Sequence, residues 1–180
     1  EVSTPYMYRR TTAIAAALSV LALGSPLMTA CTNPLATQHF NQGVEKYEAG
    51  NYQGAISDWS KAIEINPKGA IAYYNRGLAK GDLEDYQGAI ADYTKAIEIN
   101  PQNASAYNNR GLAKDDLEDY QGAIADYTKA IEIDPQNKIS YKGRGITREL
   151  VNDLEGACDD WRKAAGLGLR EPAEWVKKQC

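Results

Sequence analysis

The chain has 180 residues, which fits one compact domain, with 24% charged residues and a net charge of −4. That acidity argues against nucleic acid as a partner, because phosphates are bound by Lys and Arg. Tyr occurs twelve times and Phe once. This imbalance indicates one aromatic position copied several times, so internal repeats are the first feature to seek.

The first segment of the chain differs in chemistry from the rest. Met7 is followed by two arginines, an apolar run over 13–23 and small residues up to Ala30. This order is typical of a secretory signal peptide, and the run is shorter than the roughly 20 apolar residues that span a bilayer. We therefore predict a signal peptide over 1–30 and expect residues 1–6, before the first Met, to lie upstream of the true start.

The end of this segment resembles a bacterial lipobox, in which small residues precede a Cys that receives diacylglycerol. Thr29 and Ala30 fit the pattern, whereas Met28 stands where a branched aliphatic residue is usual. The resemblance implies that Cys31 carries a lipid anchor on the extracytoplasmic side of a bacterial cell envelope, with 31–35 as linker. The alternative is ordinary cleavage after Ala30, which leaves Cys31 as a free N-terminal residue.

A repeat of 34 residues fills the remainder. Residues 70–103 and 104–137 differ at only four positions, and the same frame extends back over 36–69 and forward over 138–171. A period of this length is typical of helical hairpins that stack on one another, because a single hairpin cannot bury its apolar face alone.

The repeated positions resemble the tetratricopeptide repeat (TPR) family. Its pattern has an aromatic residue in the fourth position, a small one in the eighth, Ala in the twentieth, an aromatic in the twenty-fourth, Ala in the twenty-seventh and Pro in the thirty-second. The two middle units supply these as Tyr73, Gly77, Ala89, Tyr93, Ala96 and Pro101, and as Tyr107, Gly111, Ala123, Tyr127, Ala130 and Pro135. The outer units depart once each, with His39 for the aromatic residue and Leu169 for the Pro.

The resemblance implies an all-α fold, a right-handed superhelical solenoid of four helix-turn-helix units with a concave inner face. These units are TPR 1 to TPR 4 over the four ranges above, and a capping helix over 172–180 follows, with Trp175 in the aromatic position. We expect Asn and Asp side chains to cap the helices and Pro residues to end each second helix. The capping residues are Asn51, Asp85, Asp119, Asp153, Asn103 and Asn137.

The sequence offers little for catalysis. His39 is the single His and is expected to pack in its aromatic position, with no nucleophile beside it. Cys158 and Cys180 lack zinc-site spacing, and Gly77 and Gly111 lie inside predicted helices rather than in a phosphate-binding loop. We therefore expect no enzyme activity, cofactor, metal or small-molecule substrate.

Two structural links are predicted. Arginines in the seventh position stand level with aspartates in the twenty-third position, both of their own repeat and of the preceding one. Because TPR 1 has Gln42 in place of the Arg, we expect each Arg to pair with the preceding repeat: Asp58 with Arg76, Asp92 with Arg110 and Asp126 with Arg144.

The second link is a disulfide between Cys158 and Cys180, which flank the last predicted turn at similar distances and leave an even number of Cys once Cys31 is lipidated. The alternative treats Cys158 as a plain core residue, because the other repeats have Ile in its position.

The predicted binding surface is the concave groove. Asn41, Asn75 and Asn109 share the sixth position of the first helix, and the resemblance implies that this position faces the groove, where an amide can bind peptide backbone. Three of the four differences between the middle repeats fall in positions expected to face the groove. The remaining predicted groove residues are Ile71, Tyr74, Ser105, Asn108, Asp82, Asp115, Asp116 and Glu149.

The sequence thus predicts a membrane-anchored scaffold that binds a protein or peptide segment carrying a hydrophobic residue beside a Lys or Arg. The carboxylate clamp of chaperone-binding relatives is not evident, because Phe40 and Val44 stand where that clamp has Lys and Asn. Two alternatives stay open: a structural spacer or assembly factor that acts through convex or edge surfaces, and an accessory subunit of a cell-envelope enzyme.

Overall fold

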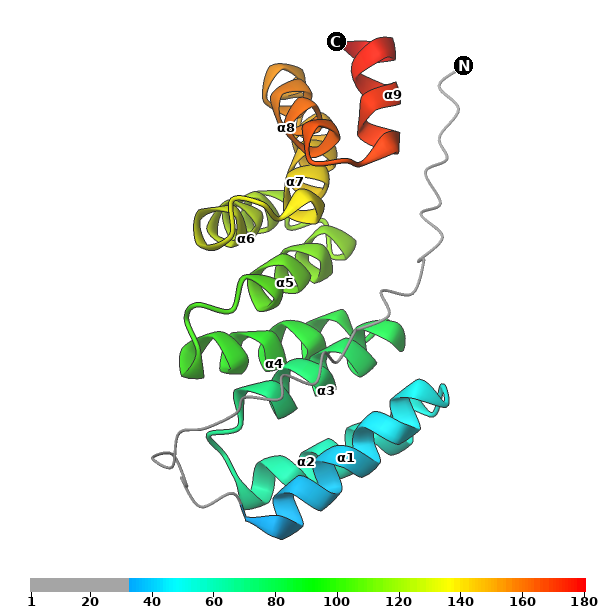
Figure 1. Cartoon of the computed structure of the whole chain (residues 1–180), viewed down its shortest axis with the longest axis vertical. Helices are drawn as coiled ribbons and strands as arrows, with labels where there is room; N and C mark the ends of the chain where they lie inside the picture. Colours follow the sequence, from blue (N-terminus) through cyan, green and yellow to red (C-terminus); the bar gives the residue numbers. More distant parts are fainter. Residues whose placement is uncertain (1–32) are drawn as a thin grey trace. The chain divides into compact units, whose positions relative to one another are not determined.

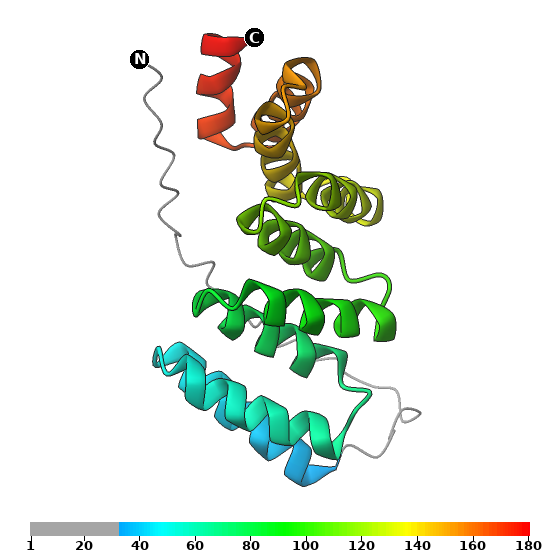
Figure 2. The same cartoon turned by 180° about the vertical axis from the view of Figure 1, so that it is seen from behind.

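The computed structural model describes residues 33–180, and all regular structure in this range is α-helical (Figures 1 and 2). The predicted signal peptide and the lipidation at Cys31 lie outside the described residues. The helices are α1 (Pro34–Glu48), α2 (Tyr52–Ile65), α3 (Ala70–Asp82), α4 (Tyr86–Ile99), α5 (Ala104–Asp116), α6 (Tyr120–Ile133), α7 (Lys138–Leu150), α8 (Leu154–Gly166) and α9 (Arg170–Gln179).

The helices form four hairpins that stack in chain order. The closest packing is within the hairpins α1–α2, α3–α4, α5–α6 and α7–α8, and the second helix of each hairpin also packs on the first helix of the next. The first helices meet as well, since α3 contacts α5 and α5 contacts α7. This pattern of neighbours confirms the predicted all-α repeat solenoid (Figure 1).

Local capping explains where the helices begin and end. Each second helix starts after an Asn or Asp whose side chain accepts a hydrogen bond from the backbone N–H three residues later, as in Asp85 to Gly88. Asn103 and Asn137 cap α5 and α7 in the same way. The Ile that ends α2, α4 and α6 is followed by one capping residue and a Pro. The predicted caps and Pro stops are confirmed, whereas α1 begins at Pro34, inside the predicted linker 31–35, because Asn33 caps it and Pro suits the first turn. Each cap contributes about 1 kcal/mol.

The core depends on a glycine in the eighth position that lies against an aromatic ring in the twenty-fourth. A Cβ placed on Gly77 would lie 2.7 Å from the Tyr93 ring, and one on Gly43 would lie 2.5 Å from Trp59. Tyr93 and Trp59 are almost fully buried. The absence of a side chain therefore lets the two helices of a hairpin approach until the ring fills the space between them.

The turn inside each hairpin has one residue in the left-handed region. Gly50 has φ 76°, Glu84 φ 63°, Glu118 φ 62° and Asn152 φ 64°. Gly and Asn adopt this conformation readily, whereas Glu does so at a cost of about 1 kcal/mol. The two middle repeats thus retain a strained residue that the outer repeats avoid.

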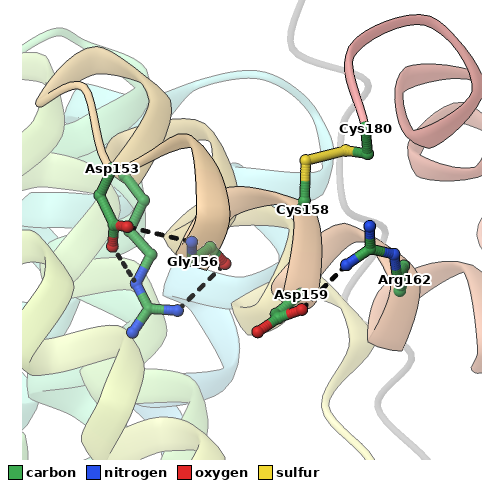
Figure 3. Close-up of a disulfide and its surroundings, with 7 residues drawn as sticks. Asp153, Gly156, Cys158, Asp159, Arg162 and Cys180 are labelled. Carbon is green, nitrogen blue, oxygen red and sulfur yellow. Dashed lines mark hydrogen bonds and ion pairs between the residues drawn. A yellow bond between two sulfur atoms is a disulfide. The ribbon is translucent and has the colours of Figure 1, made fainter.

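The last helix closes the stack. It begins at Arg170, two residues before the predicted limit, because the backbone already turns helical after Leu169. Trp175 packs edge-on against Trp161 with ring centroids 5.4 Å apart. A disulfide joins Cys158 to Cys180 across Cα atoms 5.8 Å apart, and this is the pair expected from the sequence (Figure 3). Cys158 is also buried, so it serves as a core residue as well.

Candidate functional site

The arginines of the seventh position are bound within the fold. Arg76 donates from Nε and Nη2 to both carboxylate oxygens of Asp92 at 2.9 and 2.6 Å. Its Nη1 donates to the Ser60 hydroxyl of the preceding repeat at 2.9 Å. Arg110 and Arg144 repeat this pattern on their own Asp and on the preceding Thr.

The predicted pairing of each Arg with the preceding repeat is therefore wrong, and each Arg pairs with the Asp of its own hairpin. The pairs predicted were Asp58–Arg76, Asp92–Arg110 and Asp126–Arg144; the pairs observed are Arg76–Asp92, Arg110–Asp126 and Arg144–Asp160. The reason is packing: the carboxylate lies in the close interface of one hairpin, where it is only 3–4% exposed. The preceding repeat offers only a hydroxyl at the third guanidinium nitrogen.

A second cation completes each pair, and the sequence analysis missed it. The eleventh position of the repeat holds Lys46, Lys80, Lys114 and Arg148. Lys80 and Lys114 lie 2.8 Å from Asp92 and Asp126, respectively. Comparing all four repeats at this position would have revealed the constant positive charge.

The first repeat has no Arg in the seventh position, and other cations stabilise its buried Asp58. Asp58 is buried, which alone would raise its pKa, but a hydrogen bond and the charge of Lys46, with Lys61 and His39, lower the pKa below its ordinary value. His39 Nδ1 is 3.6 Å from the Asp58 carboxylate. His39 therefore belongs to this buried charge cluster rather than to a catalytic pair.

The first helices together present a surface with the features of a binding site. We call the surface formed by α1, α3, α5 and α7 the A-helix face. Five large apolar side chains on these helices are exposed. Leu35 and Leu150 lie at the first turn of α1 and the end of α7, and the other three are Ile71 (64% exposed), Ile139 (50%) and Leu112 (42%). Ile71 and Ile139 occupy the second position of the repeat and Leu112 the ninth, and these positions are seven residues apart and thus share one side of a helix. Apolar side chains exposed along neighbouring helices are typical of a protein-binding surface.

The three predicted groove asparagines have different surroundings. Asn109 Nδ2 donates to the Tyr74 hydroxyl at 3.0 Å, and Asn109 Oδ1 accepts from Asn108 at 3.1 Å. Asn75 is half-buried and Asn41 is exposed. No hydrogen bond from the side chain of either is present within residues 33–180. The side-chain amide of Asn109 thus joins α3 to α5, whereas the side-chain amides of Asn41 and Asn75 remain available to a ligand.

Several predicted groove residues turn out to join neighbouring helices. Asn108 accepts from Ser140 of α7 at 2.8 Å. Burial raises the pKa of the Tyr74 hydroxyl, against hydrogen bonds from Asn109 and Ser105. Asp82 accepts from Tyr47 of α1 at 2.6 Å, and Tyr47 has its pKa raised by burial and then by this bond. These contacts join α1 to α3, α3 to α5 and α5 to α7 along the A-helix face.

Asp115 is the most perturbed carboxyl on this surface. Its Oδ2 accepts from Thr147 at 2.6 Å and from Tyr127 at 3.3 Å, while its Oδ1 is buried with no hydrogen bond in the described structure. Burial raises its pKa to about 6, with a smaller contribution from the charge of Asp116. The repeat pattern could not predict this raised pKa, because Gly81 occupies the same position in the preceding repeat.

Acidic residues gather at the C-terminal ends of the first helices. Glu48, Asp82 and Asp116 share the thirteenth position, and Glu149 lies one position earlier in the last repeat. All except Asp82 are exposed. The A-helix face is therefore acidic toward the ends of its helices and apolar along their length.

The opposite end of this surface contains a hollow of about 270 Å³ between α1 and α3, floored by the end of α2. The residues that line it are Asn33, Ala36, Thr37, Phe40, Ala62, Asn66, Gly69, Ile71 and Ala72. Ile71 is the one predicted groove residue among them. The sequence pattern did not reveal the hollow, because it results from the spacing between two helices.

Two negative findings apply to residues 33–180. No three His, Cys, Asp or Glu side chains in this range gather closely enough to hold a metal ion. No helix in the same range is long and apolar enough to cross a membrane.

Comparison with protein families gives matches over most of the repeats. A family model described as "Tetratricopeptide repeat" matches residues 70–103 and 104–137, the same limits as the two near-identical units. A second, described as "TPR repeat", matches residues 43–83. Together the matches span more than half of the 180 residues. Comparison with curated proteins gave no match.

Solved structures share the architecture. A crystal structure of MamA is 27% identical with a TM-score of 0.71, over 81% of this chain and 83% of that chain. The TPR domain of Arabidopsis OM64 is 31% identical with a TM-score of 0.64, over 65% of this chain and 97% of the domain. The first TPR of Spaghetti (RPAP3), bound to the HSP90 peptide SRMEEVD, is 24% identical with a TM-score of 0.65, over 66% and 94%. This last likeness is one of fold.

Proposed function

The chain belongs to the tetratricopeptide repeat family, and from that premise we propose that it is a non-enzymatic scaffold that binds an extended segment of a partner protein along its A-helix face. One observation carries the proposal: Ile71, Leu112 and Ile139 are exposed on neighbouring first helices, where they offer apolar contact to a partner. The free side-chain amides of Asn41 and Asn75 lie on α1 and α3, in the same set of first helices, and are suited to hydrogen bonds with backbone groups.

The fold supports this mode of binding. A domain of the same fold, the first TPR of RPAP3, holds a short HSP90 peptide. The ligand chemistry here differs, because the A-helix face carries acidic residues at the ends of α1, α3, α5 and α7. We therefore infer that the partner segment pairs a hydrophobic residue with a Lys or Arg, since complementary charge favours encounter and correct register.

The proposal places the scaffold outside the cytoplasm, anchored to a membrane through a lipid on Cys31. The support is the sequence pattern of residues 7–31. Metabolic labelling with a fatty-acid probe tests it, and the label should be lost in the Cys31→Ser variant. Label that persists in that variant would refute the anchor without affecting the binding proposal.

A pull-down with two matched variants tests the binding surface. Ile71→Asp places a charge on the A-helix face at a side chain that is already 64% exposed, so the fold should tolerate it. Leu154→Asp is the control, since Leu154 is 45% exposed at the first turn of α8, a second helix. We expect the amount of captured partner to fall at least tenfold with Ile71→Asp and to stay unchanged with Leu154→Asp. The reverse result would favour the alternative of a spacer that acts through its edges or convex side.

A further inference from the structure

The hollow between α1 and α3 lies where the first two repeats differ in an aromatic side chain. Phe40 occupies the fifth position in the first repeat, where the second repeat has Tyr74. The Tyr74 hydroxyl accepts from Asn109 and so draws α3 and α5 together at this point. Phe40 has no oxygen to offer to Asn75, which is the counterpart of Asn109. The helices α1 and α3 meet through Tyr47 and Asp82 near their C-terminal ends and leave the hollow near their N-terminal ends.

The lining of the hollow is uncharged and mostly apolar. Phe40, Ala62 and Ala72 contribute to its walls, and the exposed Ile71 lies beside them. A charged group buried here would lose its hydration without gaining a partner, so the lining selects a neutral apolar occupant. Its volume of about 270 Å³ lies just below the range of typical small-molecule sites, which begins near 300 Å³, and suits a side chain rather than a whole cofactor.

Polar donors stand around this apolar lining. The side-chain oxygens of Asn33 and Asn66 accept from the backbone N–H of Leu35 and Lys68. The Nδ2 groups of the same two residues donate no hydrogen bond within residues 33–180. Together with Asn75, they can donate to carbonyl groups of a segment that passes over the hollow.

We propose that the hollow between α1 and α3 is the specificity pocket of the A-helix face and takes one aliphatic side chain of an extended partner segment, whose backbone carbonyls accept from Asn33, Asn66 and Asn75. This inference rests on the proposed function and adds the residue type that the partner must present. The occupant is a partner segment rather than a whole domain, because the free amides suit the regularly spaced carbonyls of an extended backbone.

The acidic residues at the ends of the first helices determine where the partner segment carries its positive charge. The hollow lies at the second and fifth positions of the repeat, and the acidic residues lie at the thirteenth. Eleven residues of helix rise about 16 Å, and an extended chain covers that distance in about five residues. The partner segment therefore carries its Lys or Arg at least about five residues from the aliphatic side chain, where Glu48 and Asp82 can attract it.

Selection from a random peptide library displayed on phage, with the full-length chain as bait, tests this inference. The blocking variant is Thr37→Trp, which fills the hollow from an exposed position on α1. The control is Gln38→Trp, an exposed neighbour that does not line the hollow. A second variant, Phe40→Tyr, gives Asn75 the internal partner that Asn109 has and draws α1 toward α3.

We expect the unmodified chain and Gln38→Trp to enrich peptides that carry Leu, Ile or Val and, at least about five residues away, a Lys or Arg. Thr37→Trp and Phe40→Tyr should reduce the affinity of a selected peptide at least tenfold. Enrichment of basic peptides without an aliphatic preference overturns the pocket and leaves the proposed function standing. Enrichment of nothing overturns both. If the chain instead self-associates, and Thr37→Trp abolishes this self-association, the inference is also overturned, because a second copy of the chain would then occupy the hollow.

Discussion

Asp115 shows how strongly one side chain can depend on its surroundings. Thr147 and Tyr127 donate to one of its oxygens, while the other oxygen is buried without a hydrogen bond in the described structure. In such a position the charged carboxylate is less stable, relative to the neutral acid, than it is in water. Burial therefore raises the pKa of Asp115 from 3.8 to about 6. The proton is therefore held more tightly in the folded chain than in the unfolded one.

This difference predicts a pH dependence. The folded pKa lies above the unfolded value, so the contribution of Asp115 to stability is complete below pH 4 and is lost as the pH rises through 6. Asp115→Asn should be more stable than the unmodified chain at neutral pH by about 1–2 kcal/mol, and this advantage should shrink as the pH falls to 5. Urea unfolding at several pH values measures it. The exposed Glu64→Gln is the control, and an equal pH dependence in both variants would contradict the assignment.

The glycine of the eighth position predicts a second effect at the residue scale. Gly77→Ala places a Cβ 2.7 Å from the Tyr93 ring and should destabilise the fold by about 1–3 kcal/mol through overpacking. Gly166→Ala is the matched control, because it lies at the end of α8 with nothing within 4 Å of its Cβ. That variant should be neutral or slightly stabilising, since Ala favours the helix over Gly. Thermal unfolding of both variants gives the comparison, and equal losses would contradict the close approach.

At the scale of elements, the Arg–Asp pairs join the two helices of each hairpin. Asp126 is 4% exposed and accepts two hydrogen bonds from Arg110. Arg110→Met should destabilise the fold by about 2–3 kcal/mol, because it leaves a buried carboxylate with Lys114 as its remaining cation. The double variant Arg110→Met with Asp126→Leu should recover much of the loss, since a buried apolar pair is often equivalent to an ion pair. Denaturant unfolding measures both, and a double variant as unstable as the sum of its single variants would contradict the pairing.

The disulfide acts at the same scale by holding α9 against α8. Cys180→Ser removes the bond at its exposed end and should cost about 3 kcal/mol, the entropy of a closed loop of this length. The loss should appear first as cleavage within α9 in limited proteolysis, while α1 to α6 stay resistant. A control variant, Gln179→Ser, changes the neighbouring exposed residue and should leave the pattern unchanged. Uniform sensitivity along the chain would show that the bond supports more than the last helix.

The fold could be predicted from the sequence more fully than the candidate site. Period, caps and the Gly–aromatic positions repeat four times, so each hairpin confirms the assignment of the others. The prediction of the ion-pair partners was wrong because the sequence offered two Asp residues at the same height as each Arg. Only the packing of the helices decides which of the two carboxylates lies within hydrogen-bond distance of the Arg. The hollow and the burial of Asp115 also depend on spacing between helices, and a repeat pattern treats equal positions as equal. Tyr74 with Asn109 and Phe40 with Asn75 show that they are not.

At the scale of the whole molecule, stacking puts four unlike first helices side by side. Their exposed apolar residues, free amides and acidic ends differ from repeat to repeat, while the buried Gly, Ala and aromatic positions hardly vary. The packing positions that are alike in the four repeats hold the solenoid together. The exposed positions of the A-helix face can therefore vary and specify a partner. This division of roles predicts that the partner contacts the first helices and, at the hollow, the end of α2, but not the rest of the second helices.

Site-specific photo-crosslinking in cells tests that claim most directly. A photoreactive residue is placed at exposed positions of the first helices, Asn41 and Ser105, and at exposed positions of the second helices, Ser57 and Ala125. We expect a crosslinked partner from Asn41 or Ser105 and none from Ser57 or Ala125. A partner captured from Ser57 or Ala125 alone would contradict it.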